Sequence, residues 1–322
     1  MKLDLYDRKI LYYLDMNSRY TLGELGKLVR LSKNAISHRI KNLVKEGIIR
    51  KFYSVINTQK LGYSYFKVYF KLQNTNEKSE KEIIDYIINK IPSLWVNSWE
   101  GRYDLMAGIL AKNIEEFYEI LNSLINKFRK NIQSYDIFIV ISAPHFKKNY
   151  LLEQSKSQAK IEEFGGKTEI IEVDDIDRKI LKEMAENSRI QIVELVEKIN
   201  STIDIIRYRL KKLNENEIIQ GYRILIDYPK INYQLYKVLI SAQNLDKEAE
   251  KKIIEYCSSI PNIADIIIRG IGSWNIELQI DAKNSQEFHN IFKDFKNKFN
   301  NLIKSHETLL MINEYKLNYF PF

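Results

Sequence analysis

Apolar residues recur at helical spacing in three consecutive segments near the start of the chain, which predicts three short helices. We place them at residues 4–15, directly after Thr21, and from Ser32 onward. Thr21 and Glu24 have the spacing of a capping box, Ser32 is a good N-cap, and Gly47 favours the end of the third helix. The buried stripes are formed by Leu5, Ile10, Leu11, Leu14, Leu22, Leu25, Leu28, Val29, Ile36, Ile40 and Leu43. Three helices with a short turn before the last one predict a helix-turn-helix, whose third helix enters the major groove of DNA.

From about residue 66 the pattern changes to the periodicity of strands, interrupted by two further helical stretches. The predicted strands are residues 66–72, 94–99, 105–110 and 132–141, and the predicted helices are residues 80–91 and 114–128. This β-α-β-β-α-β order is that of ferredoxin-like folds. A four-stranded sheet with both helices on one face leaves its other face to be covered, most simply by a second copy.

The chain contains that second copy. The segment DLYDRKIL at residues 4–11 returns as DDIDRKIL at residues 174–181, and the correspondence continues at a constant offset of 170 residues as far as Asn74 and Asn244. After small length changes the offset becomes 171, which pairs Gly101 with Gly272. Self-similarity over this length indicates that each copy is one structural unit.

The predicted fold class is therefore α+β, a tandem duplication of a helix-turn-helix DNA-binding domain followed by a ferredoxin-like βαββαβ sensing domain. We call the two helix-turn-helix domains the first head, residues 1–60, and the second head, residues 173–230. The ferredoxin-like effector and assembly domains occupy residues 61–146 and 231–322. Residues 147–172, which are rich in Lys, Gln, Ser and Glu, are predicted to be a linker.

Composition excludes several classes of protein. With 45% hydrophobic residues among 322, the chain is too apolar to be disordered, and it has no long uncharged apolar run. We therefore expect no membrane span, no signal peptide and a cytoplasmic protein. The lone Cys257 excludes an internal disulfide framework, and the four histidines lack metal-ligand spacing. We expect no metal and no cofactor, and packing roles for Trp95, Trp99 and Trp274.

Net charge separates the two heads. The first head contains 13 basic and 5 acidic residues, a net charge of +8, whereas the second contains 11 of each. Because neutralised phosphates supply much of a protein's affinity for DNA, we predict that the first head binds double-stranded DNA far more strongly than the second.

Polar side chains form a stripe on the third predicted helix, opposite Ile36, Ile40 and Leu43. Such a stripe supplies donors for base edges and phosphates, although an ordinary solvated helix face has the same pattern. Arg39 lies nearer the buried side, where packing or a single phosphate contact fits better than base reading, and the second stripe also carries Asp204. The candidate DNA-binding residues are Ser32, Lys33, Asn34, Ser37, His38, Arg39 and Lys41 in the first head, and Arg207, Tyr208 and Lys211 in the second.

The first head resembles the DNA-binding domain of the Lrp/AsnC (feast/famine) regulators in the pattern Asn17-Ser18-Arg19, Glu24-Leu25, Leu31-Ser32, Ile36, Arg39-Ile40, Leu43, Gly47-Ile48-Ile49. The ferredoxin-like domain resembles the amino-acid-sensing domain of that family. The resemblance implies a transcription regulator whose basic unit is a dimer joined through its sheets and often assembled further. This chain would be that dimer fused into one polypeptide, and we expect a homo-oligomer of fused pseudo-dimers.

The same resemblance places an amino-acid effector near the Gly-x-x-Asp turns. The candidate effector-binding residues are Gly101, Arg102, Tyr103, Asp104, Gly272 and Ser273. A plain strand-connecting turn is the alternative, because Gly and Asp are turn residues wherever they occur. The second copy departs from the family pattern at three positions, with Gln191 for Thr21, Glu217 for Gly47 and Asn275 for Asp104.

These patterns predict a sequence-specific DNA-binding regulator rather than an enzyme, modulated by a small molecule such as an amino acid. One alternative is an enzyme similar to the siroheme decarboxylases, which share this architecture and bind a tetrapyrrole through His and Arg. The strand segments 94–100 and 263–268 contain no His, which favours DNA. The other alternative is a ligand-sensing scaffold whose heads do not bind DNA.

Overall fold

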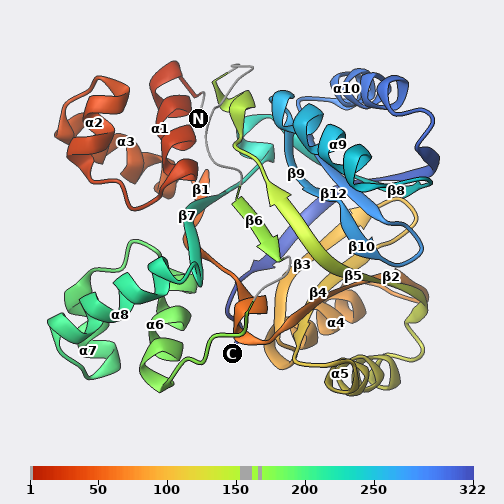
Figure 1. The fold of residues 1–322 in the computed structure, drawn as a ribbon, viewed down its shortest axis with the longest axis horizontal. Helices are drawn as coiled ribbons and strands as arrows, with labels where there is room; N and C mark the ends of the chain where they lie inside the picture. Colours follow the sequence, from red (N-terminus) through yellow and green to blue (C-terminus); the bar gives the residue numbers. More distant parts are fainter. Residues whose placement is uncertain (1–2, 153–161, 166–168) are drawn as a thin grey trace.

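The computed structural model of the chain describes residues 3–152, 162–165 and 169–322. The two heads lie on one side of a larger body of strands, whose outer surface is covered by helices (Figure 1). This arrangement confirms the predicted α+β tandem duplication.

Each head is a compact group of short helices. The first head contains α1 (Leu5–Met16), α2 (Leu22–Val29) and α3 (Lys33–Lys45), and the second contains α6 (Asp175–Glu186), α7 (Ile192–Ile199) and α8 (Ile203–Glu215). The predicted capping box is present, since Thr21 Oγ1 accepts from the N–H of Glu24 at 3.2 Å and Glu24 accepts from the N–H of Thr21 at 2.8 Å. Gln191, the corresponding residue of the second head, makes no side-chain cap.

A pair of strands that the apolar pattern did not predict joins the two copies. β1 (Ile49–Ile56) continues from the first head and pairs antiparallel with β7 (Ile219–Ile226), which continues from the second. The N–H of Ser18 donates to the carbonyl of Tyr222 at 2.8 Å, so α1 rests on β7. The symmetric contact places α6 on β1. Each head is therefore supported by the strand of the other copy.

Both ferredoxin-like sheets form as predicted. The first contains β2 (Ser64–Leu72), α4 (Glu77–Lys90), β3 (Ser93–Glu100), β4 (Leu105–Ala111), α5 (Ile114–Lys127) and β5 (Ile132–His145). The second contains β8 (Gln234–Ala242), α9 (Lys247–Ser259), β9 (Ile263–Ile267), β10 (Arg269–Ile271), β11 (Ile276–Ala282), α10 (Ser285–Lys298) and β12 (Ile303–Leu317). Between the copies, β6 (Glu162–Gly165) adds to β5 within the predicted linker. The short 3₁₀ turns are η1 (Thr58–Leu61), η2 (Asn149–Leu151) and η3 (Pro229–Ile231).

The two sheets join at both edges and close into a ring of strands in the order β5-β2-β4-β3-β12-β8-β11-β9, with β9 returning to β5. One junction is the long pairing of β3 with β12. At the other junction β5 pairs with β10 over Arg269–Ile271 and with β9 at the register pair of His145 with Asp265, next to a 2.9 Å bond from the N–H of Phe146 to the carbonyl of Ala264. The sequence predicted that the sheets cover each other's faces, and the structure adds that their edges pair.

Apolar residues on the strands divide between the outside and the inside of this ring. On β2, Phe66 and Phe70 face outward into a core under α4 and α5, whereas Tyr69 belongs to an inner cluster that continues through β1 and β7 into the heads. A third cluster lies under α9 and α10. Trp99 and Trp274 are buried in the inner cluster, which fits the packing role expected for them.

Candidate nucleic-acid interface

The outer face of α3 carries the polar stripe that the sequence predicts. Ile36 and Leu43 on the opposite face are fully buried against the rest of the head, which fixes the rotation of the helix. The residues presented to solvent are Lys33, Asn34, His38 and Lys41, together with the half-buried Ser37. Donors for phosphates and for base edges therefore share one surface of the first head.

Two of the candidate residues also have partners within the helix. Ser32 Oγ accepts from the N–H of Ala35 at 3.2 Å, so this hydroxyl holds the start of α3. The amide nitrogen of Asn42 lies 3.3 Å from Nδ1 of His38, one turn away on the exposed side. These contacts keep the side chains of the stripe close to the helix.

Arg39 has a structural partner set. Its Nη1 lies 2.7 Å from Asp7 Oδ1 and 2.9 Å from Asp4 Oδ2, at the N-terminus of α1. The hydrogen bond to Asp7 raises the pKa of Arg39 above its ordinary value. Arg209 repeats this arrangement in the second head, with contacts of 2.8 Å to Asp174 and 3.1 Å to Asp177. Both arginines therefore tie the third helix of a head to its first helix.

The outer face of α8 differs from that of α3 in chemistry. Arg207, Tyr208 and Lys211 are exposed as predicted, but Lys211 lies 3.7 Å from Glu215 on the next turn. The first turn of α8 also exposes Ile203 and Ile205, each at 42% of its full area. An apolar and charge-balanced face has fewer groups to offer to phosphates than α3 has.

A symmetric contact fixes the two heads relative to each other. The hydroxyls of Ser18 and Ser188 lie 2.6 Å apart. Arg19 donates to the carbonyl of Ser188 at 2.6 Å, and Arg189 donates to the carbonyl of Ser18 at 2.6 Å. The repeated Asn-Ser-Arg segments, which end the first helix of each head, thus form the junction between the heads.

The two predicted effector turns approach each other at Asp136 on β5. Tyr103 donates to Asp136 Oδ2 at 2.7 Å, and Ser273 from the turn of the second copy donates to Asp136 Oδ1 at 2.6 Å. Arg102 donates to Glu307 at 2.6 Å. Hydrogen bonds from Ser273 and Tyr103 outweigh the effect of burial and lower the pKa of Asp136. Asp136 and Glu307 lie outside the Gly-x-x-Asp pattern, so the sequence did not single them out.

Asp104 holds its own turn in place. Its carboxylate accepts from Lys71 Nζ at 2.9 Å and from the N–H of Leu72 at 2.7 Å. Asn275 makes the corresponding contact in the second copy, where it accepts from the N–H of Ala242 at 2.7 Å. Gly101, which begins the turn of the first copy, has φ +139°, and a Cβ added to it would lie 2.8 Å from the side chain of Leu309. Glycine and a short polar side chain are therefore required by the turn itself.

A cavity of about 120 Å³ lies inside the molecule, between the ring of strands and the β1–β7 pair. Sequence reasoning did not predict it, because its walls come from segments far apart in the chain. Its charged lining residues are Lys67, His145, Lys148, Arg223, Asp265 and Glu314. Within the described ranges, no group of three or more His, Cys, Asp or Glu side chains is placed to hold a metal ion. In those ranges no helix is long and apolar enough to cross a membrane.

Comparison with known proteins identifies the class. A model of winged helix-turn-helix DNA-binding domains matches residues 3–50 and 173–220. The chain is 33% identical over 150 residues to an HTH-type transcriptional regulator of Pyrococcus abyssi, covering 45% of this chain and 97% of that protein. It is 31% identical over 127 residues to the regulator FL11 of the same organism, covering 38% of this chain and 83% of that protein.

A crystal structure of an AsnC family transcriptional regulator from Agrobacterium tumefaciens is 21% identical, covers 45% of this chain and 94% of that one, and has a TM-score of 0.41. The chain belongs to the HTH-type transcriptional regulators, and it carries their winged helix-turn-helix domain twice in one polypeptide.

Some similar solved structures span nearly the whole chain. The siroheme decarboxylase NirDL covers 98% of this chain and 94% of that one, with a TM-score of 0.62 and 12% identity. A likeness at this identity concerns the fold alone. The sequence argument that His is missing from two strands overlooked His145, which lines the interior cavity together with Arg223. The cavity is nevertheless smaller than the roughly 300 to 1,000 Å³ of sites for drug-sized ligands.

Proposed function

We propose that this regulator reads specific DNA sequences chiefly through α3 of its first head. The observation that carries the proposal is the polar stripe on α3, presented to solvent by a head with a net charge of +8. The second head has no net charge and presents apolar residues at the same place. Fusion releases the two heads from the identity that a homodimer imposes, and so permits this specialisation.

Two arrangements on DNA follow from such asymmetry. A single chain would protect a lopsided site with one strong half, whereas two associated chains would present their first heads to a palindrome with half-sites about 10 bp apart or a multiple of that. Genome-wide mapping followed by footprinting would identify the site, and sedimentation of the complex would count the chains. Two equivalent half-sites protected by one chain would contradict the proposal.

The base-reading role of α3 is tested by small substitutions. Asn34→Ala or Ser37→Ala should each cost about 1 to 3 kcal/mol of binding free energy on the mapped operator and relax the base preference there, because a hydrogen bond to a base edge is lost. Lys41→Gln serves as the comparison, since loss of a phosphate contact weakens all sequences alike. Quantitative gel shifts on operator and scrambled DNA measure both. Unchanged operator affinity after Lys33, Asn34 and Ser37 are replaced together would reject this face.

We also propose that a small molecule such as an amino acid modulates the regulator near the Gly-x-x-Asp turn. An amino group would contact the Asp104 carboxylate, in addition to the two bonds that this carboxylate already accepts. Isothermal titration with the common amino acids should then find a ligand whose affinity falls at least tenfold in Asp104→Ala. Asp104→Asn is the matched control for folding, because Asn275 holds the other turn with an amide. No binding, or equal binding after Asp104→Ala, would leave the turn a structural role.

The enzyme alternative is tested with the same preparation. The full-length likeness to a siroheme decarboxylase is the observation that favours it. If the chain is a DNA regulator, incubation with siroheme should leave no bound chromophore after desalting, while operator DNA is shifted in a gel. A stable visible absorption spectrum together with no DNA binding would reverse this conclusion.

A further inference from the structure

The interior cavity has walls from both copies, including the strands β1 and β7 that support the heads. Lys67 comes from β2, His145 ends β5, Lys148 follows it, and Arg223 comes from β7. Only His145 and Lys148 are close in the sequence, so the fold brings these four side chains together. Burial of charged side chains is costly unless they are paired, so a cluster of them around one cavity requires a partner set or a ligand.

The charge distribution inside the ring arises from differences between the copies. β4 of the first copy places Met106 and Leu110 on the inner face, whereas the equivalent positions of β11 carry Glu277 and Asp281. A symmetric dimer would repeat every inner charge twice. In the fused chain the inner carboxylates of β11 have no equivalents on β4.

The cations that line the cavity are paired with carboxylates that do not line it. Lys67 Nζ lies 2.5 Å from Glu277, and both Lys148 Nζ and Arg223 Nη2 lie 2.9 Å from the carboxylate of Asp15. Burial by itself would raise the pKa of Asp15, but the charges of Arg223 and Lys148 outweigh it and lower that pKa. Neither Glu277 nor Asp15 lines the cavity. The cavity therefore meets the cationic side of these pairs.

The acids on the cavity wall only partly balance these cations. Asp265 is matched by His145, whose Nδ1 lies 3.3 Å from its carboxylate. Glu314 is matched by Arg50, whose Nη1 lies 3.1 Å from its carboxylate. Lys148 and Arg223, which share the single carboxylate of Asp15, thus leave the wall with a positive charge in excess that suits an anion.

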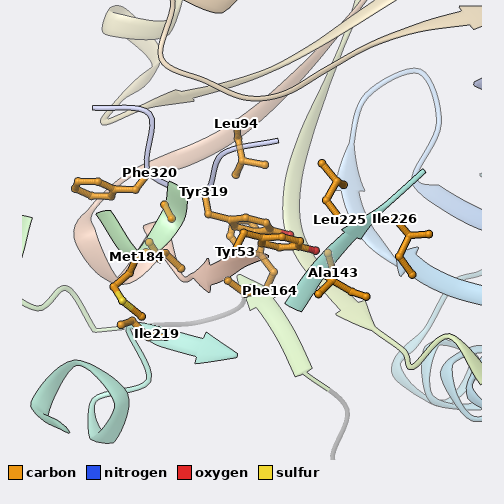
Figure 2. Close-up of a cluster of buried hydrophobic side chains, with 14 of the residues drawn as sticks. Tyr53, Leu94, Ala143, Phe164, Met184, Ile219, Leu225, Ile226, Tyr319 and Phe320 are labelled. Atoms are coloured by element: carbon orange, nitrogen blue, oxygen red, sulfur yellow. The ribbon is translucent and has the colours of Figure 1, made fainter. Parts of the chain in front are cut away.

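The rest of the lining is apolar and aromatic. Figure 2 shows the rings of Tyr53 and Tyr319 lying against each other, with Leu94, Ala143 and Phe164 around them. All five residues line the cavity. Its volume accommodates several water molecules or one small organic molecule. A carbon skeleton satisfies the apolar part of this surface, and an anionic end satisfies the charged part.

We propose that the cavity binds a small organic carboxylate, with its carboxylate toward Lys148 and Arg223 and its carbon chain toward Tyr53 and Leu94. The ligand would compete with Asp15 for these two cations. Asp15 lies on α1, and Arg223 lies on the strand that supports α1. Binding would therefore alter the contact that holds the first head, which gives a direct route to regulation if the head binds DNA as proposed above.

Isothermal titration of the full chain without DNA tests the ligand. Succinate, glutarate and butyrate serve as probes, 1,4-diaminobutane as a cation of similar size, and inorganic phosphate as an anion without a carbon chain. We expect binding of at least one carboxylate and none of the diamine. Phosphate binding as tightly as the best carboxylate, or no carboxylate binding at millimolar concentration, would overturn the proposal.

Variants then place the ligand in the cavity. Lys148→Met should weaken binding at least tenfold, and Ala143→Leu should abolish it by filling the space while every charge remains. Lys247→Met, on the exposed start of α9, is the matched control and should bind as the parent chain does. Thermal unfolding verifies that each variant is folded. Unchanged affinity in both cavity variants would show that the carboxylate binds elsewhere.

A gain of affinity provides a signature that a purely structural pair would not give. Asp15→Asn removes the internal competitor, so the carboxylate should bind several-fold more tightly, even though the variant is less stable. Equal or weaker binding in a folded Asp15→Asn chain would refute the competition. These titrations contain no DNA, so the two proposals can fail separately. A chain that binds DNA but no carboxylate would reject this inference and leave the proposed function intact. A chain that binds a carboxylate but no DNA would reject the proposed function and leave the ligand site intact.

Discussion

Replacing Lys33 and Lys41 of the first head with glutamine should weaken DNA binding at least tenfold and reduce its dependence on salt. Each phosphate contact that is lost lowers the slope of log affinity against log salt by about 0.9. The corresponding pair in the second head, Arg207→Gln with Lys211→Gln, should have much less effect. Titrations of the mapped operator at several salt concentrations give both numbers for each variant.

These variants keep Arg39 and Arg209, because both arginines stabilise the fold of their heads. Arg39 and Arg209 each bind two carboxylates of the first helix of their head, so their loss would damage that head rather than a DNA contact. Arg39→Met is therefore the control for indirect effects, and it should lower the unfolding temperature. Equal losses of affinity from the two heads would refute the asymmetry.

The expected difference in DNA affinity between the two heads has a long-range cause and a short-range cause. A net charge of +8 on the first head should attract the phosphate backbone before any contact forms, whereas the second head has no net charge to do so. At short range, Ile203 and Asp204 on α8 stand where α3 has the donors Lys33 and Asn34, which substitutes apolar surface and a negative charge for them. Both effects act in the same direction.

Features whose cause is local in sequence were predictable. The caps at Thr21 and Ser32 need only residues within three positions, and both bonds are present in the structure. The helices and strands of each copy follow from the period of their apolar residues, and the repeat made every such prediction twice. The polar stripe of α3 was predictable for the same reason, since helical periodicity brings its members to one face.

Features that depend on pairing across the whole chain were not predictable. β1 and β7 are 170 residues apart, and neither segment shows a clear alternation, because both sides of each strand are partly covered. Asp104 matched a family pattern, yet its nearest partners come from β2, about 33 residues earlier. The cavity needed the fold most of all, since residues such as Lys67 in a largely apolar strand look solvent-exposed until the closed ring places them inside.

Replacing two equivalent lysines inside the ring of strands should have opposite effects on the stability of the protein. Lys67 and Lys237 stand at the same position of the two copies, and both are buried within about 5.5 Å of the ring of Trp95. Lys67 is paired with Glu277 at 2.5 Å, whereas no carboxylate of the described residues lies within 4 Å of the Lys237 ammonium. Burial, followed by repulsion from Lys67, lowers the pKa of Lys237 from 10.5 to about 8.

Lys237→Met should therefore stabilise the protein, and Lys67→Met should destabilise it. A pKa that falls from 10.5 to about 8 corresponds to about 3 kcal/mol at neutral pH, so about 2 kcal/mol of gain is expected after repacking. Since the unfolded chain binds the additional proton between pH 8 and 10.5, this gain should shrink as pH rises through that range. Lys67→Met leaves Glu277 buried without its cation and should cost about 3 kcal/mol or more. Urea unfolding of the three chains at pH 7 and pH 9.5 measures these differences, and a loss of stability in Lys237→Met at pH 7 would show that its ammonium is well compensated in the folded protein.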